Sequence, residues 1–411
     1  MNINNFARKR WFMLVLYGII NLCIGSLYAW SVFAGPLQEQ LNVRNLSMVY
    51  TVSTSLGPVT MIAGGFLQRK LNTRWILLLS GAAYGLGILL SGFATGKGSL
   101  FLTYGLIAGL AAGLAYGCTM GNSVKMFPDK RGLAGGVAAA TYGGSSVIIP
   151  PVANVLIERV GVMNSLKVLG AIFLILICVC GLMVKECPED FVPVGWASNA
   201  RKTISEGMRW SQMMKTADFY IMLGLLLCGA VSGLMTISQA SAMAQKLVGM
   251  SVSAAAIMVS MLSVFNAAGR ILSGMLSDKI GRIKTLMLML LVSLAGIFLL
   301  GISSSGRVLI FAVGIASIGF GFGAFLGVYP GFTADRFGQK HQSVNYGIMF
   351  VGFAIAGLIG PSVASRAYHS SGTYGIAFAA AAALCVVGLL LASIYDVWRR
   401  KCVAREILSQ R

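Results

Sequence analysis

Charged residues are scarce in this chain of 411 residues, at 11% of the sequence, and acidic residues are the scarcest, with 12 Asp and Glu against 32 Lys and Arg. A soluble domain carries about 25% charged residues because its surface faces water, so a soluble multidomain enzyme is excluded. Proline is also rare, whereas 57% of the residues are hydrophobic, which excludes a disordered chain. Long apolar runs replace the alternation of an outer-membrane barrel. The sequence is therefore that of an all-α integral membrane protein.

Motifs for metal, nucleotide or covalent chemistry are missing as well. The eight cysteines mostly lie inside apolar runs, and none clusters with either of the two histidines at metal-ligand spacing. No Gly-x-x-x-x-Gly-Lys-Ser/Thr loop is present, and the glycine-rich stretches 109–113 and 319–323 do not belong to a strand–helix–strand pattern. No nucleophile–base pair is visible either. We therefore expect no metal, no cofactor and no bound nucleotide, and we expect that the chain is not an enzyme.

Twelve apolar stretches predict twelve transmembrane helices, since a span needs about 20 mostly apolar residues. Their predicted positions are residues 11–34, 47–69, 75–95, 99–126, 132–158, 165–185, 218–244, 251–277, 285–304, 307–334, 341–367 and 373–398. The first stretch follows Arg8-Lys9-Arg10, as in a signal peptide. Its length and its lack of a cleavage site favour a membrane helix instead.

A polar stretch in the middle of the sequence predicts two domains. We expect an N-terminal six-helix bundle at 1–186, a cytoplasmic linker at 187–217, and a C-terminal six-helix bundle with a short basic tail at 218–411. The two halves also repeat, because the loops that start at Gly65 and Gly274 are 209 residues apart. Such a repeat predicts two pseudo-symmetric bundles, a plan that recurs in secondary transporters.

Basic residues gather on one side of the predicted membrane. With both termini placed in the cytoplasm, 24 of the 32 Lys and Arg fall on the cytoplasmic side and seven in outer loops, which leaves Arg270 inside a helix. This asymmetry predicts a multi-pass protein with cytoplasmic termini. We expect the membrane to be the bacterial inner membrane. It also explains the net charge of +20 without a nucleic-acid partner. The lipid bilayer is the expected partner, and we expect a monomer.

The loop that starts at Gly274 reads Gly-Met-Leu-Ser-Asp-Lys-Ile-Gly-Arg-Ile-Lys and resembles the signature of the major facilitator superfamily, Gly-x-x-x-Asp-Arg/Lys-x-Gly-Arg-x-Arg/Lys. The resemblance implies the fold of two six-helix bundles and a conformational role for four residues, Asp278, Lys279, Gly281 and Arg282. In the first-half copy Arg69 stands where the acid belongs and Asn72 where the second glycine belongs. If that acid anchors a cytoplasmic gate, the first-half gate must be held differently here.

A narrower resemblance covers nearly the whole chain. It is carried by Arg10-Trp11-Phe12, Tyr28-Ala29-Trp30, Phe127-Pro-Asp-Lys-Arg-Gly-Leu133, Tyr142-Gly143 and Asn345-Tyr346-Gly347. These strings resemble the oxalate/formate antiporter group, which is related to the monocarboxylate transporters. The resemblance implies transport of small organic anions. Asn345 and Tyr346 begin the eleventh predicted helix, and we assign them to the gate.

Arg270 is the strongest candidate for a binding residue. It precedes Asp278 by eight residues, which is about 12 Å at 1.5 Å per residue. A cation at that depth costs at least about 2.5–3.5 kcal/mol, so it needs a reason. It is either a structural arginine bonded to helix carbonyls or a carboxylate-binding fork. All twelve acids lie in loops or near predicted helix ends, so we predict that a bound anion supplies the counter-charge. In the resembled group a helix-8 arginine binds the substrate, and Arg270 matches its position.

Further residues are candidates for substrate binding. Asn266 precedes Arg270 by four residues and therefore shares its helix face. The resemblance implies that tyrosines at three matching positions line the anion cavity, and phenylalanines would supply an apolar wall. These candidates are Tyr28, Tyr116, Tyr142, Phe322, Phe350 and Phe353. For each of them ordinary packing is the alternative.

The resulting prediction is a secondary transporter that works by alternating access between its bundles. Phe353 occupies the position where the oxalate exchanger has a second cation, so we prefer a monocarboxylate of formate, pyruvate or lactate size. Exchange is favoured because His341 and His369 lie in opposite loops, away from a central cavity. The alternatives are a proton-coupled symporter using an edge acid such as Glu39, an oxalate/formate exchanger, and a membrane anion sensor. The sensor is disfavoured because no sizeable output domain is present.

Overall fold

The structure is a computed structural model that describes residues 3–43, 46–188, 191, 193 and 207–409. Within these residues every regular element is a helix and no strand is found. The predicted all-α membrane fold is therefore confirmed. Arg44 and most of the expected linker, including Arg201, Lys202 and Glu206, lie outside the described residues.

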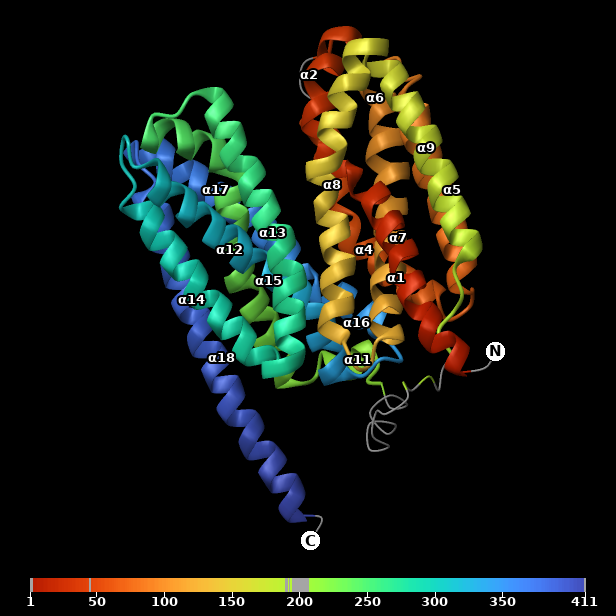
Figure 1. The fold of residues 1–411 in the computed structure, drawn as a ribbon, viewed down its shortest axis with the longest axis vertical. Helices are drawn as coiled ribbons and strands as arrows, with labels where there is room; N and C mark the ends of the chain where they lie inside the picture. The colour runs from red at the N-terminus through yellow and green to blue at the C-terminus, as the bar shows by residue number, and fades with distance from the viewer. Residues whose placement is uncertain (1–2, 44–45, 189–190, 192, 194–206, 410–411) are drawn as a thin grey trace. The chain divides into compact units, whose positions relative to one another are not determined.

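The helical elements follow one another along the chain (Figure 1). They are α1 (Ile3–Ile24), η1 (Gly25–Ala29), α2 (Trp30–Leu41), α3 (Ser47–Ser55), α4 (Gly57–Leu67), α5 (Thr73–Ser91), α6 (Lys97–Leu100), η2 (Phe101–Ala108), α7 (Gly109–Met126), α8 (Arg131–Val160), α9 (Val162–Met183), α11 (Trp210–Met213), α12 (Ala217–Val248), α13 (Val252–Ile280), α14 (Arg282–Gly301), α15 (Val308–Phe337), α16 (Gln342–Met349), α17 (Val351–Ser371) and α18 (Gly375–Ser409).

Eleven helical segments of the described chain are long and apolar enough to cross a membrane. The remaining predicted helix, at 47–69, is present as two shorter pieces, α3 and α4, that meet at Leu56. Pro58 explains this break, because a proline has no N–H to donate and its ring clashes with the carbonyl four residues earlier. All twelve predicted apolar stretches are thus helical.

Three predicted helix ends are wrong. The first helical stretch begins at Ile3 rather than at residue 11 and reaches Leu41 rather than residue 34, and the last helix runs to Ser409 rather than to 398. The start of the first and the end of the last were predicted next to basic residues. Lys and Arg are good helix formers, so a helix continues past the apolar span that crosses the membrane.

The chain divides by its internal contacts into two units. Unit 1 consists of Met1–Trp210 and Thr333–Ile348, and unit 2 of Ser211–Phe332 and Met349–Arg411. The expected domain boundaries put residues 333–348 in the second bundle. In the structure the chain enters unit 1 at Thr333 and returns to unit 2 at Met349.

Within unit 1, α5 and α9 run side by side, and α1 lies against α7 and α8 (Figure 1). Glycines make the contact between α5 and α9 close. A Cβ atom on Gly85 would lie 2.5 Å from the Cα of Leu174, and one on Gly170 would lie 2.6 Å from the Cα of Leu89. Small residues at such interfaces let helix backbones approach in a membrane.

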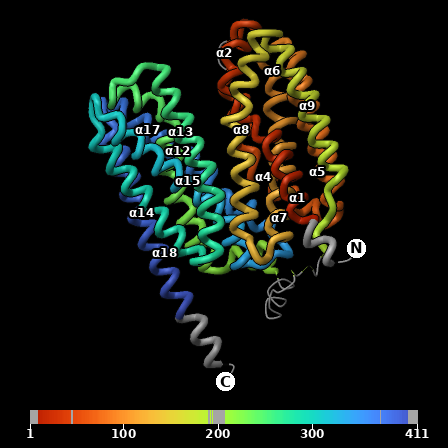
Figure 2. The backbone as a smooth tube through the Cα atoms, viewed as in Figure 1, coloured from red at the N-terminus to blue at the C-terminus, as the bar shows by residue number. Residues whose placement is uncertain are grey.

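Within unit 2, α12 contacts α13, α17 and α18, and α14 runs beside α18 (Figure 2). Tyr329 of α15 is fully buried, and its hydroxyl donates to the Met222 carbonyl of α12 at 2.7 Å. A buried tyrosine hydroxyl needs such a partner. This bond joins α15 to α12 in the interior of the unit.

Replacing Gly85 with Ala is expected to destabilise the protein by about 1–3 kcal/mol, because the added methyl group overpacks the α5–α9 contact. The matched control is Gly144→Ala in α8, where nothing lies within 4 Å of the added Cβ atom. Thermal unfolding of both variants in detergent measures the difference. Equal midpoints for the two variants would contradict the close packing of α5 on α9.

Candidate functional site

Arg270 and Asn266 form a buried pair on α13 in unit 2. Arg270 is 6% exposed and Asn266 is 8% exposed. The Nε atom of Arg270 donates to Oδ1 of Asn266 at 2.8 Å. Because a guanidinium can only donate, this bond sets the orientation of the Asn266 amide and of the guanidinium plane. The predicted proximity of the two side chains is present in the structure.

Glycines of α15 allow the backbone of α13 to approach closely at Asn266 and Arg270. A Cβ atom on Gly323 would lie 2.9 Å from the carbonyl carbon of Asn266, and one on Gly327 would lie 2.8 Å from that of Arg270. Gly269 makes the reciprocal contact, where a Cβ atom would lie 2.9 Å from the carbonyl carbon of Phe320. Real Cβ atoms do not approach so closely. The α13 backbone at Arg270 therefore rests directly on the α15 backbone.

The three candidate phenylalanines form an apolar group of their own in unit 2. The ring of Phe353 lies 4.6 Å from that of Phe350 and 6.1 Å from that of Phe322. Around them are Ala230, Val231, Leu326 and Ala356. Phe322 lies on Gly233 of α12, whereas its neighbour Gly323 lies on α13. Because adjacent helix residues point about 100° apart, the phenylalanines and Arg270 meet different faces of α15.

The three candidate tyrosines come together in unit 1. The ring of Tyr142 lies 5.4 Å from that of Tyr28 and 4.5 Å from that of Tyr116. Gly25 permits this arrangement, because a Cβ atom there would lie 2.9 Å from Cβ of Ser145 on α8. The stretch η1, which carries Tyr28, therefore lies directly on α8. The group joins the first, fourth and fifth predicted helices.

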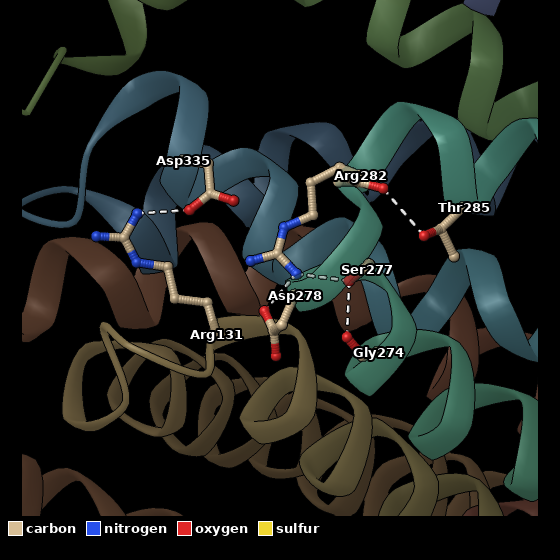
Figure 3. A network of polar contacts seen from close by, with 8 residues as sticks. Arg131, Gly274, Ser277, Asp278, Arg282, Thr285 and Asp335 are labelled. Atoms are coloured by element: carbon tan, nitrogen blue, oxygen red, sulfur yellow. Dashed lines mark hydrogen bonds and ion pairs between the residues drawn. The ribbon is translucent and has the colours of Figure 1, made fainter.

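The signature loop between α13 and α14 forms a compact polar network. Arg282 Nη1 forms an ion pair with Asp278 Oδ1 at 2.7 Å. The same nitrogen also donates to Ser277 Oγ at 2.5 Å (Figure 3). Gly281, between the two helices, has φ of +93°, a conformation that favours glycine. The side chain of Lys279 is exposed at the end of α13.

Asn345 and Tyr346 lie in the α16 segment that belongs to unit 1. Both are buried, at 0% and 2% exposed. Asn345 Nδ2 donates to the Met208 carbonyl at 3.0 Å, and the Met208 N–H donates to the Phe337 carbonyl at 2.9 Å. These bonds hold the stretch 207–209 against the end of α15.

Sequence reasoning missed Arg131 as a structural centre of unit 1. Its Nη1 atom donates to Asp335 Oδ1 at 2.6 Å (Figure 3). With its amide turned to place oxygen toward Arg131, Gln339 accepts from Nε and Nη2 at 2.9 Å. One buried arginine therefore binds two residues near the end of α15. The scarcity of acids could have indicated it. In a chain with so few acids, an aspartate near a predicted helix end is a candidate for an ion pair with a nearby cation.

A second missed pair joins two of the strings that carried the resemblance. Arg10 donates to both oxygens of Asp129, at 2.5 and 2.9 Å, and its guanidinium lies 4.6 Å from the centre of the Phe127 ring. The Trp11 ring lies 4.8 Å from the Phe127 ring. The start of the first helix and the loop before α8 thus form one charged and aromatic contact in unit 1.

Comparison with known proteins bears on this geometry. The sequence profile of one family, described as Major Facilitator Superfamily, matches residues 10–361 and, in a second match, residues 221–401. The uncharacterized MFS-type transporter YhjX of Escherichia coli (strain K12) is 30% identical over 87% of this chain and 88% of its own. The oxalate:formate antiporter of Oxalobacter formigenes is 27% identical over 86% of this chain and 83% of its own. Monocarboxylate transporter 12-B of Danio rerio is 26% identical over 77% and 71%.

Solved structures share the fold. The MFS transporter FucP superposes with a TM-score of 0.71 at 15% identity, over 93% of this chain and 98% of its own. The proton:xylose symporter XylE superposes with a TM-score of 0.71 at 14% identity, over 93% and 95%. At these identities the likeness establishes the architecture.

Replacing Asp129 with Asn is expected to lower the free energy of unfolding by about 1.5–3 kcal/mol, because the buried guanidinium of Arg10 loses a charged acceptor. Combined with Arg10→Gln, the loss should be less than the sum of the single losses by about 1 kcal/mol. Asp396→Asn is the control, because in its pair with Arg400 the two side chains are 31% and 68% exposed. Denaturant unfolding in mixed micelles measures all four variants. Additive losses at Arg10 and Asp129 would contradict a stabilising pair.

Proposed function

The chain belongs to the Major Facilitator Superfamily, and on that premise we propose that it carries small organic anions whose carboxylate binds Arg270. It is a multi-pass membrane transporter rather than an enzyme. The observation that carries the proposal is the buried pair of Arg270 and Asn266, whose side chains are bonded at 2.8 Å. Two relatives, an oxalate:formate antiporter and a monocarboxylate transporter, support anions as the substrate class.

The geometry of Arg270 suits a carboxylate. A guanidinium presents paired N–H groups in one plane, which match the two oxygens of a carboxylate. The bond from Nε to Asn266 holds that plane in one orientation before substrate arrives. A ligand that meets an oriented group loses less entropy on binding than one that must order it. The guanidinium of Arg270 is therefore already oriented before a carboxylate binds.

We propose a monocarboxylate of formate, pyruvate or lactate size as the substrate. One arginine balances one carboxylate, whereas a compact dianion such as oxalate favours a second cation. Phe353 stacks on Phe350 at the position where the resemblance places that second cation. Oxalate/formate exchange is the closest alternative, and it differs only in the charge of the substrate.

We propose anion exchange by alternating access, with Tyr28, Tyr116 and Tyr142 contributing to the path of the anion. Tyrosine hydroxyls can donate to carboxylate oxygens along an otherwise apolar path. Asp278, Arg282, Asn345 and Tyr346 are proposed to act in the conformational change, with Lys279 and Gly281 completing the signature loop. The excess of basic residues in the loops assigned to the cytoplasm supports cytoplasmic termini. The Escherichia coli relative supports the bacterial inner membrane as the location.

Uptake of labelled formate, pyruvate, lactate and oxalate into proteoliposomes tests the proposal. Vesicles preloaded with the same anion are expected to take up label faster than empty ones, because exchange needs a partner on the inner side. Equal uptake into empty vesicles that rises with an inward proton gradient would replace exchange by symport. Absence of transport for all four anions would overturn the substrate class.

Replacing Arg270 with Gln is expected to reduce this uptake by about 30-fold or more, since losing a buried charged partner costs about 2–5 kcal/mol. Arg307→Gln is the matched control, because Arg307 is exposed in the loop before α15. It should leave uptake within about twofold of the unsubstituted protein, as surface changes usually do. Both variants are compared after their thermal unfolding shows that they fold. Full uptake by Arg270→Gln would rule out Arg270 as the anion site.

Replacing Asn266 with Asp is expected to abolish uptake while preserving the fold. The new carboxylate has the shape of the amide and would lie 2.8 Å from Nε of Arg270, so it neutralises the guanidinium internally. Asn266→Leu is the companion variant, which removes the acceptor and leaves the positive charge. It should raise the KM of uptake without abolishing transport. If the Asp variant transports normally, the positive charge of Arg270 is not what binds substrate.

A further inference from the structure

Arg69 occupies the position where the superfamily signature has an acid, and the structure gives it a histidine as partner. The Nη2 atom of Arg69 lies 3.2 Å from Nδ1 of His341, within unit 1. Beside it, Ser343 Oγ donates to Gln68 Oε1 at 2.8 Å. The turn after α4 therefore binds His341, between α15 and α16, and Ser343 in the first turn of α16.

The chemistry of this contact specifies the charge of His341. A guanidinium has donors only, so the Nδ1 atom of His341 must accept the hydrogen bond from Arg69. A ring that accepts at Nδ1 carries its proton on Nε2 and is neutral. The protonated ring has two donors and no acceptor, and it adds a positive charge beside Arg69. The contact therefore exists only while His341 is neutral.

Other cations of unit 1 surround His341. Partial burial lowers the pKa of His341 from its ordinary value, and the positive charges of Arg69, Lys340, Arg209 and Lys125 lower it further. Gly207 brings the stretch that carries Arg209 close, because a Cβ atom there would lie 2.7 Å from Cβ of Lys340.

Two carboxylates of the same region are engaged elsewhere. Asp335 binds Arg131 at 2.6 Å, and Glu186 accepts from Thr73 at 3.4 Å. The charged groups that shift the pKa of His341 are all cations. They repel a proton added to the ring.

We propose that His341 is a proton-operated latch, whose protonation breaks the bond with Arg69 and loosens the attachment of residues 338–345 to the turn after α4. The bonds from Ser343 to Gln68, from Arg131 to Gln339 and from Asn345 to Met208 do not involve His341 and stay in place. This inference holds whichever substrate the chain carries. It also gives the first-half loop a means of closure that does not need the missing acid. The segment 338–345 lies between Thr333, where the chain enters unit 1, and Met349, where it returns to unit 2.

The pH dependence has a defined sign. The docked state holds the pKa of His341 below its ordinary value, and the released state returns it toward about 6.5. The released state therefore binds a proton more readily. Docking is fully favoured above about pH 6.5 and weakens as the pH falls below it. Acidification on the side assigned to the cytoplasm would open the latch.

Nitrogen NMR of the full-length chain tests the state of the ring. The chain has two histidines, so His369→Gln leaves His341 as the single signal. In lipid nanodiscs at about pH 7.5, where a free imidazole is mostly neutral, Nδ1 should be unprotonated, and the ring should titrate below about 6.5. Lys340→Gln should raise the pKa without touching the bond to Arg69. A protonated Nδ1 at about pH 7.5, or a pKa of His341 that Lys340→Gln leaves unchanged, would overturn the proposal.

Hydrogen exchange of the backbone tests the release itself. Exchange of residues 338–345, corrected for the intrinsic pH dependence, should rise by up to about tenfold per pH unit below about 6.5, the limit for one proton. His341→Asn keeps an acceptor near the Nδ1 position but cannot titrate, so its profile should be flat. His341→Lys should exchange fast at every pH. Identical profiles for the unsubstituted chain and His341→Asn would overturn the latch.

These measurements need no substrate. Failure of anion transport would therefore leave their outcome unchanged, and failure of the latch would leave the assignment of Arg270 standing. Peptides from α9, which contacts α5 in the interior of unit 1, provide the internal reference for exchange.

Discussion

Burial of an arginine inside an apolar helix is the constraint on which the candidate site depends. Arg270 is 6% exposed in α13, a helix long and apolar enough to cross a membrane. A cation in such surroundings requires polar partners and a defined orientation. Asn266, one turn away, gives Arg270 that orientation, and Gly323 and Gly327 bring the supporting helix against its backbone. The proposed substrate follows because a carboxylate matches an oriented guanidinium.

Charge pairs at helix ends organise much of the remaining polar structure. Each of three aspartates binds an arginine, in the pairs Arg10–Asp129, Arg131–Asp335 and Arg282–Asp278. With 12 acids against 32 Lys and Arg, most cations must find other partners. Arg69 illustrates one solution, a neutral histidine that accepts a hydrogen bond. Such a partner differs from a carboxylate because it loses its accepting nitrogen when the ring is protonated, as the pH falls below about 6.5.

The fold could be predicted from apolar runs because the membrane requires each span to be apolar over about 20 residues. Helix ends were harder, since a helix such as α18 continues beyond the bilayer. The neighbour Asn266 followed from its spacing to Arg270, because both lie on one helix. The pair of Arg131 and Asp335 did not, since its members are 204 residues apart and no spacing rule relates them. Residues 333–348 joined unit 1 through such long-range bonds.

The glycine contact between α13 and α15 has a mechanical consequence. Where Gly327 meets the backbone of Arg270, no flexible side chain lies between the helices to absorb a displacement. Closely packed elements transmit strain rather than deform. A shift of α15 at Gly327 is therefore passed on to the backbone of Arg270 rather than absorbed between the helices. At the proposed site, substitutions in α15 can consequently move Arg270 without touching a substrate themselves.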